Sequence, residues 1–248
     1  MTTKMTTMLD WLRRDPREVP RIEVLGRALP IVMRRTASAR RMTMRLAPDG
    51  SEVRITLPRW GRSGEALEFA RSRADWLASQ LAALPAPVAL VDGASLPFRG
   101  ATHILRHDPA RPRRVRAEAG ELHIGGPAEG LDGRLRRWLE GEARRLMAED
   151  LAHYCARADQ PPARLMLSRA TRRWGSCAHD GTIRLNWRLV MAPDSVRRSV
   201  VAHEVAHLLH MDHSPRFHAA LKSLFEGDID AANQWLKREG RSLYVPFG

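Results

Sequence analysis

The sequence His-Glu-Val-Ala-His at residues 203–207 constrains the local fold of this chain more than any other feature. Its two imidazoles stand four residues apart, and side chains at positions i and i+4 share one face of an α-helix. A helix start lies upstream at Ala-Pro-Asp, residues 192–194, because proline is tolerated in a first turn and an acidic residue favours the N-terminal end of the helix dipole. We therefore predict a helix from about Asp194 that presents His203 and His207 on one side.

This spacing is typical of a zinc site. Both imidazoles can reach a single ion, and Glu204 lies beside them. A bound Zn²⁺ lowers the pKa of its water towards ~7, and a neighbouring carboxylate can accept the proton as the water attacks a polarised carbonyl. We predict one zinc ion per chain, with His203 and His207 as ligands. Glu204 is then the catalytic base of a hydrolase, and the chemistry is that of peptide-bond hydrolysis.

A third ligand must come from further along the chain. If the helix continued to His210, that residue would lie about 10.5 Å from His203 along the axis at ~1.5 Å per residue, too far for both to bind one ion. A break at residues 211–212 would instead let His213 fold back, and metzincins use the same ten-residue span between their first and third histidines. The alternative is an acidic ligand from a later helix, with Glu226 and Glu239 as the candidates.

Two further segments accompany the histidine motif. They are Ser-Arg-Ala-Thr-Arg-Arg-Trp-Gly-Ser-Cys at 168–177 and Leu-Asn-Trp-Arg-Leu at 185–189. Together with residues 203–217, they resemble the YgjP-like metallopeptidase family, which is related to the SprT-like zinc peptidases. The resemblance is densest over 168–217 and looser over most of the chain. It implies a zinc-peptidase-like (zincin) core behind a β-rich N-terminal extension, with Glu204 as base and His203, His207 and His213 as ligands.

The hydrophobic pattern predicts an α+β fold with two regions. Residues 20–130 read as a β-rich region with one helix over 63–84 and a hairpin around Pro-Asp-Gly at 48–50. Residues 131–248 read as the metallopeptidase-like domain, with a helix from about Asp132, a small sheet and the active-site helix; the two regions are compatible with one compact unit. We find no internal sequence repeat.

The expected substrate is a peptide or protein. Zinc peptidases of this plan lay an extended substrate along an edge strand above the active-site helix, so we expect the alternating segment 182–190 to be that strand. The candidate substrate-binding residues are Arg173, Trp174, Asn186 and Trp187. A packing role is the alternative for the large apolar side chains of this region, and Cys155 and Cys177 are expected to be small buried residues.

The charge balance leaves two other functions open. With 41 basic and 28 acidic residues, the chain carries a formal charge of +13 and should attract nucleic acid or nucleotides nonspecifically. The first alternative is a metal-dependent nucleoside triphosphate pyrophosphatase, although the chain has no Gly-x-x-x-x-Gly-Lys loop. The second is a nucleic-acid-associated SprT-like protein, in which the zinc is structural or the peptidase acts only on DNA-bound partners. Structural zinc sites, however, normally have four protein ligands. A coding bias towards arginine would also explain the charge.

The sequence also bears on location. No stretch approaches the ~20 apolar residues that a transmembrane helix needs, so we expect no membrane integration. The first twenty residues contain arginines and Trp11 instead of an apolar signal core, and two cysteines make no disulfide framework. We therefore expect a cytoplasmic protein.

Overall fold

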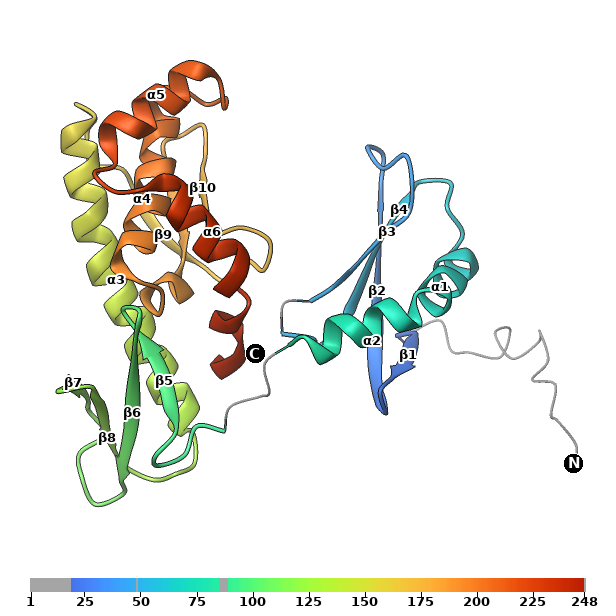
Figure 1. Ribbon diagram of the computed structural model, residues 1–248, viewed down its shortest axis with the longest axis horizontal. Helices are drawn as coiled ribbons and strands as arrows, with labels where there is room; N and C mark the ends of the chain where they lie inside the picture. The colour runs from blue at the N-terminus through green and yellow to red at the C-terminus, as the bar shows by residue number, and fades with distance from the viewer. Residues whose placement is uncertain (1–18, 48, 85–88, 248) are drawn as a thin grey trace, which may run out of the picture. The chain divides into compact units, whose positions relative to one another are not determined.

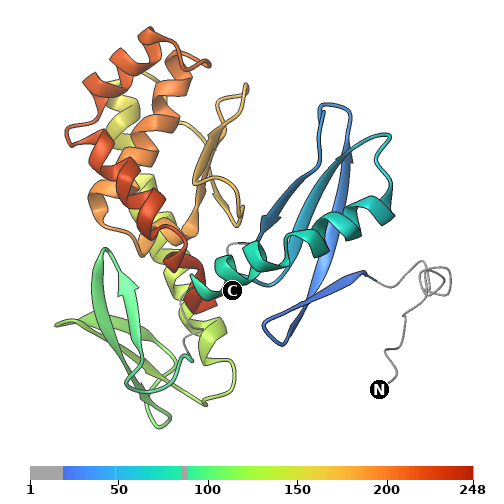
Figure 2. The same cartoon turned by 45° about the vertical axis from the view of Figure 1, so that its right-hand side comes forward.

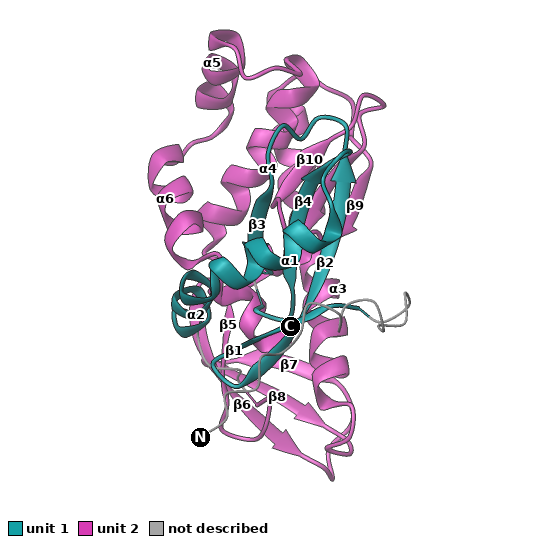
Figure 3. Ribbon diagram, turned by 90° about the vertical axis from the view of Figure 1, so that its right-hand side faces the viewer, with its two compact units in different colours: residues 1–84 teal, residues 85–248 magenta. Residues whose placement is uncertain are grey.

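The computed structural model describes residues 19–47, 49–84 and 89–247. The chain divides into two compact units, residues 1–84 and 85–248 (Figure 3). The sequence analysis placed a boundary near residue 130 instead; the difference arises because strands between 95 and 125 share a hydrophobic core with the helix that follows them. The prediction that the first twenty residues are no secretory signal falls almost wholly outside the described residues.

The first unit is a four-stranded sheet covered on one face by two helices (Figures 1 and 2). Its strand order is β1-β2-β4-β3, in which β2 and β4 are parallel and the two outer pairs are antiparallel. The antiparallel pairing of β3 with β4 confirms the predicted hairpin, of which Pro48 lies outside the described residues. The elements are β1 (Arg21–Val24), β2 (Arg27–Thr36), β3 (Thr43–Leu46), β4 (Val53–Pro58), α1 (Ser63–Ser72) and α2 (Ala74–Ala82).

The single helix predicted over 63–84 is two helices. The backbone N–H of Arg73 donates to the carbonyl of Ala70, 3.2 Å away, which is a three-residue spacing that tightens the turn and interrupts the α-helix. Both helices still bury apolar residues against the sheet, such as Ala70 and Leu77 against Ile55. The predicted apolar face was therefore correct, although the helix was not continuous.

The second unit contains two sheets and the longest helix, α3 (Leu131–Arg157), which begins within one residue of the predicted start. The first sheet has the order β5-β6-β8-β7 and repeats the pairing pattern of the first unit, antiparallel, parallel and antiparallel. This is a repeat of topology for which the sequence showed no matching repeat. Its strands are β5 (Ser95–Phe98), β6 (Ala101–Asp108), β7 (Val115–Glu118) and β8 (Glu121–Gly125).

The second sheet lies beside the helix that carries the histidine motif. Its order is β10-β11-β9, so β11 is the central strand. The strand predicted over 182–190 ends at Asn186, whose side-chain oxygen accepts the Arg188 N–H at 3.1 Å and starts a 3₁₀ turn. The elements are β9 (Leu165–Ser168), β10 (Gly175–Cys177), β11 (Ile183–Asn186), η2 (Trp187–Val190), α4 (Asp194–Leu209), α5 (Pro215–Leu224), α6 (Ile229–Glu239) and η3 (Ser242–Phe247).

One hydrophobic core joins these elements. It includes Leu105 and Leu122 from the first sheet, Leu139 from α3, Leu185 from β11 and Val205 from α4, all fully buried. The chain is therefore of the α+β class, as predicted. Among the described residues, no helix is long and apolar enough to span a bilayer.

Candidate metal centre

Helix α4 begins at Asp194, as the sequence predicted, and ends at Leu209. Its buried face includes Val201, Val205 and Ala206, which pack into the core of the second unit. That packing fixes the rotation of the helix about its axis, and the i, i+4 spacing then places the rings of His203 and His207 4.9 Å apart. The two imidazoles are only partly buried and remain accessible to a ligand.

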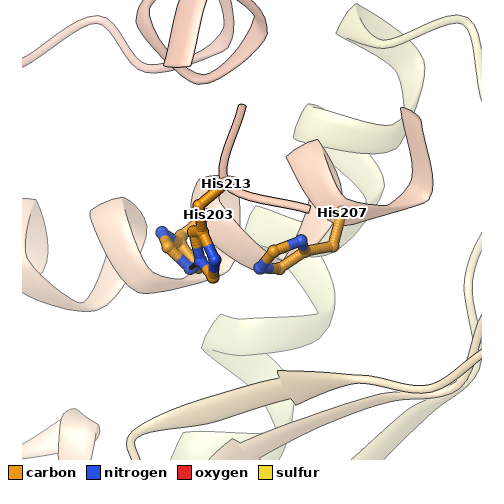
Figure 4. Close-up of side chains that lie close together, drawn as sticks. All are labelled: His203, His207 and His213. Carbon is orange, nitrogen blue, oxygen red and sulfur yellow. Dashed lines mark hydrogen bonds between the residues drawn. The ribbon is translucent and has the colours of Figure 1, made fainter. Parts of the chain in front are cut away.

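The chain turns sharply after α4. His210 has an extended backbone, with φ −143° and ψ 109°, so the break comes one residue before the predicted one. Asp212 then accepts a hydrogen bond from the backbone N–H of Ser214 at 3.3 Å, which shapes the loop before α5. This loop brings His213 back over α4, where its Nε2 atom lies 3.4 Å from Nε2 of His203 (Figure 4).

The three histidines form a group that fits a metal ion. One ring nitrogen from each of His203, His207 and His213 lies within 4.8 Å of the others. Two nitrogens that bind one tetrahedral zinc ion at ~2.0–2.1 Å would stand about 3.3–3.4 Å apart, which matches the observed separation of His203 and His213. Among the described residues this is the one group of at least three His, Cys, Asp or Glu side chains with such geometry.

The protonation of the site also suits a metal. Burial lowers the pKa of His203 to about 4, with a further contribution from His207 and His213, and burial likewise lowers the pKa of His207. Both rings are therefore neutral at pH 7, as metal ligands must be. Nδ1 of His207 lies 3.1 Å from the carbonyl oxygen of His210, so Nδ1 carries the proton and Nε2 is left as the free ligand atom.

A phenylalanine holds the three rings in place. Phe217, on α5, is fully buried, and its ring centroid lies 4.5 Å from that of His207, 4.8 Å from His213 and 5.0 Å from His203. The ring stacks on His207 and meets the other two imidazoles edge to face. This role of Phe217 was not predicted from the sequence, in which its one signal is the position four residues after His213.

Glu204 lies beside the histidines on the side of β10. It is 5% exposed, and burial raises the pKa of its carboxyl to about 7. Two groups oppose that rise: the backbone N–H of Cys177, which donates a hydrogen bond to the carboxylate, and the positive charge of Arg173. A carboxyl group with a pKa near 7 is suited to accept and return a proton at neutral pH.

The predicted substrate residues separate into two groups. Arg173 is exposed and close enough to act on Glu204 electrostatically, so it lies at the site. Trp174 is half-buried and packs its ring 5.7 Å from that of Tyr244. Asn186 and Trp187 are both buried, and the amide of Asn186 donates to the carbonyl of Ala170, so the structure gives both side chains a packing role.

The remaining candidates lie apart from the histidine group. Glu226 accepts hydrogen bonds from Tyr154 at 2.9 Å and from Arg198, and Glu239 forms an ion pair with Arg238 at 2.8 Å. The ring of His210 does not belong to the group that could hold a metal. Both cysteines are free; Cys155 is buried, as expected, whereas Cys177 is partly exposed.

Comparison with known proteins identifies the family. The model of the YgjP-like, metallopeptidase domain matches residues 40–239. The chain belongs to this family. The match confirms the resemblance seen in the sequence, and at the family level it indicates a metal-dependent peptidase. The matched range includes all three histidines and Glu204, and it also extends into the first compact unit.

Other comparisons add little. No curated protein matches the chain. Among solved structures, the crystal structure of the metallopeptidase zymogen of Pyrococcus abyssi abylysin is similar at 20% sequence identity, with a TM-score of 0.34. The match covers 41% of this chain and 99% of that chain. At that identity and TM-score, the likeness carries no inference about the activity of this chain.

Proposed function

We propose that this chain is a zinc-dependent peptidase of the zincin type. His203, His207 and His213 hold the metal, and Glu204 is the general base. The proposal depends above all on one observation: three imidazole nitrogens from two segments converge within 4.8 Å, next to a buried glutamate. When bound, zinc would polarise the scissile carbonyl and lower the pKa of a water molecule in the site.

Glu204 supplies the proton transfer. Its carboxylate accepts a proton from the attacking water and later returns it to the leaving amine. The hydrogen bond from the Cys177 N–H and the charge of Arg173 favour the ionised form that can accept the proton, while burial opposes it. These opposing effects support a base that gains and loses a proton near neutral pH.

The substrate strand proposed for 182–190 must be reassigned, because β11 is flanked on both sides. The edge strand next to α4 is β10. The backbone N–H of Asn186 donates to the Trp174 carbonyl, and the backbone N–H of Ala178 donates to the Thr182 carbonyl. The even-numbered positions of β10 and of its flanks therefore turn their peptide groups towards β11. The peptide groups of Gly175 and Cys177 therefore face the edge of β10 away from β11. An extended peptide can add there through the peptide group of Gly175, because the Cys177 N–H is directed to Glu204.

A panel assay tests the proposed function. The full chain is prepared metal-free and zinc-loaded, and both forms are assayed for new amino termini from casein and for pyrophosphate release from nucleoside triphosphates. We expect zinc-dependent release of amino termini. Glu204→Gln should retain about one zinc per chain and lose at least about 10²-fold in rate, because the residue acts as base and not as ligand.

Glu149→Gln is the matched control, since Glu149 is exposed and pairs only with the surface residue Arg145. It should keep the full rate. Pyrophosphate release without peptide cleavage would refute the peptidase proposal in favour of the nucleotide hydrolase. Full activity of Glu204→Gln, or loss of its zinc, would show that Glu204 has another role.

A further inference from the structure

The carboxylate of Glu204 lies directly against the backbone of β10. A β-carbon placed on Gly175 would come within 2.7 Å of Cγ and 2.8 Å of Cδ of Glu204, and still closer to Oε1. Real β-carbons essentially never approach other atoms below about 3.0 Å, and all three nearest atoms belong to Glu204. Any other residue at 175 would therefore have to displace this one side chain.

Backbone conformation does not explain the glycine. The φ angle of Gly175 lies outside the left-handed region, so any residue could adopt its backbone geometry. Gly181, in the turn between β10 and β11, has a φ of 76°, which lies in the left-handed region that favours glycine. The reason for glycine at 175 is thus the space that Glu204 occupies.

A second residue of β10, Cys177, also lies close to the Glu204 carboxyl. Gly175 pairs with Leu185 and Cys177 pairs with Ile183, and both residues turn their own peptide groups towards the free edge of β10. The Cys177 N–H favours the ionised form of the Glu204 carboxyl and so lies close to it. Gly175 leaves the space that the carboxylate occupies.

We propose that Gly175 is a positioning residue: by lacking a side chain, it allows the carboxylate of Glu204 to lie against β10, beside the histidine group. The inference rests on the proposed function, in which Glu204 is the base. Because Glu204 is 5% exposed, the carboxylate has little free space to which it could retreat. An added methyl group therefore moves the base relative to the histidines.

The first measurement needs no metal. In the metal-free protein, the Cys177 amide resonance is sensitive to the nearby carboxylate of Glu204, and Glu204→Ala gives the value of the resonance without that carboxylate. We expect Gly175→Ala to shift this resonance in the same direction and by a comparable amount. Gly141→Ala is the matched control, because Gly141 lies within α3 and a β-carbon there meets no atom within 4 Å; it should leave the resonance unchanged.

The second measurement separates positioning from general damage. Zinc-loaded Gly175→Ala should keep about one zinc per chain and a KM within about twofold, while kcat falls by about 10²-fold, as expected when a catalytic group is misplaced by ~1 Å. In the double variant Gly175→Ala/Glu204→Asp, the shorter aspartate side chain leaves space for the added methyl group. Glu204→Asp should therefore lower kcat much less in the Gly175→Ala background than in the wild type.

Three results would overturn the inference: an unchanged Cys177 amide with kcat within twofold of wild type, loss of zinc in Gly175→Ala, or strictly additive effects in the double variant. If Gly175→Ala fails to fold, recovery of folding in the double variant supports the proposal, and failure of both refutes it. A wild-type protein without peptidase activity would instead refute the proposed function, and the amide comparison would still test the placement of Glu204.

Discussion

The ring of Phe217 stacks on the imidazole of His207, with centroids 4.5 Å apart and planes inclined by 30°. Because Phe217 also touches His203 and His213, one apolar side chain from α5 orients all three histidines. Hydrophobic groups around a metal site limit the motion of its ligands and exclude water. The orientation of the three histidines thus depends on a residue that is itself neither a candidate ligand nor the candidate base.

We predict that Phe217→Leu weakens zinc binding by about tenfold and lowers the free energy of unfolding by about 1–2 kcal/mol. The physical reason is that leucine fills part of the volume but cannot stack on the imidazoles. Zinc titration against a competing chelator measures the first effect. Phe225→Leu is the control, because Phe225 is also buried but has no ring contact with the three histidines; equal loss of zinc affinity in both variants would contradict the prediction.

A set of single substitutions tests the third ligand. We expect His213→Ala to lose most of its zinc, because its Nε2 atom lies next to that of His203. His210→Ala, Glu226→Ala and Glu239→Ala should keep about one zinc per chain, because none of these side chains belongs to the histidine group. Elemental analysis after dialysis provides the measurement. Full zinc in His213→Ala, with loss in any of the other three, would show that the ligand assignment is wrong.

Metal removal should destabilise the second compact unit. A ligand that binds only the folded state at ~100 times its Kd stabilises that state by about 2.7 kcal/mol. The unit spans residues 85–248, for which each kcal/mol corresponds to about 2–4 °C, so chelation should lower its Tm by roughly 5–10 °C. Calorimetry with and without zinc measures the shift. In His203→Ala the shift should disappear; an equal shift in that variant would place the metal elsewhere.

A buried ion pair connects α3 to α4, the helix that carries His203 and His207. Asp150 accepts hydrogen bonds from Arg197 at 2.7 Å and from Arg198 at 3.2 Å, and the side chains of Asp150 and Arg197 are 5% and 3% exposed. Asp150→Ala removes one of the two carboxylates that pair with buried Arg197, the other being Asp194, so the free energy of unfolding should fall by about 1–3 kcal/mol. Urea denaturation measures the loss, and exposed Glu149→Ala should change stability by less than about 0.5 kcal/mol. Equal effects of the two substitutions would refute the role of burial.

We also propose that the chain binds nucleic acid weakly and without sequence preference, on the basis of its charge of +13. Such binding comes from phosphate neutralisation and should weaken at least about tenfold between ~50 and ~200 mM salt. Fluorescence anisotropy with two unrelated oligonucleotides of equal length checks both statements. A clear preference for one oligonucleotide, or an affinity that salt leaves unchanged, would indicate a dedicated binding pocket.

Much of the geometry of the candidate metal centre could be predicted because it is local. The positions of His203, Glu204 and His207 on one helix follow from the helical repeat, which depends only on residues within one turn of each other. The start of α4 and the β3–β4 hairpin likewise follow from Pro-Asp and Pro-Asp-Gly sequences. The return of His213 towards His203 could also be predicted, because a continuous helix would carry the chain away from His203.

The structure differs from the sequence-based expectations where an element depends on distant partners. Residues 182–190 alternate like a strand, yet the side chain of Asn186 ends the strand, and β9 and β10 make it central instead of an edge. Trp187 looked like a substrate contact and is instead fully buried. The boundary near residue 130 differed from the compact units because β5–β8 pack with α3. Hydrophobic pattern shows that a side chain is buried, but not against which neighbour.

The sequence by itself determined the family, the α+β class and the local geometry of His203, Glu204 and His207, because a motif and a helical period are properties of short segments. Only the tertiary structure decided that Phe217 lies against the histidines and that Gly175 leaves room for Glu204. Gly175 and Glu204 are 29 residues apart in the chain. Their contact exists because β10 packs beside α4, and such packing depends on the whole core of the second unit.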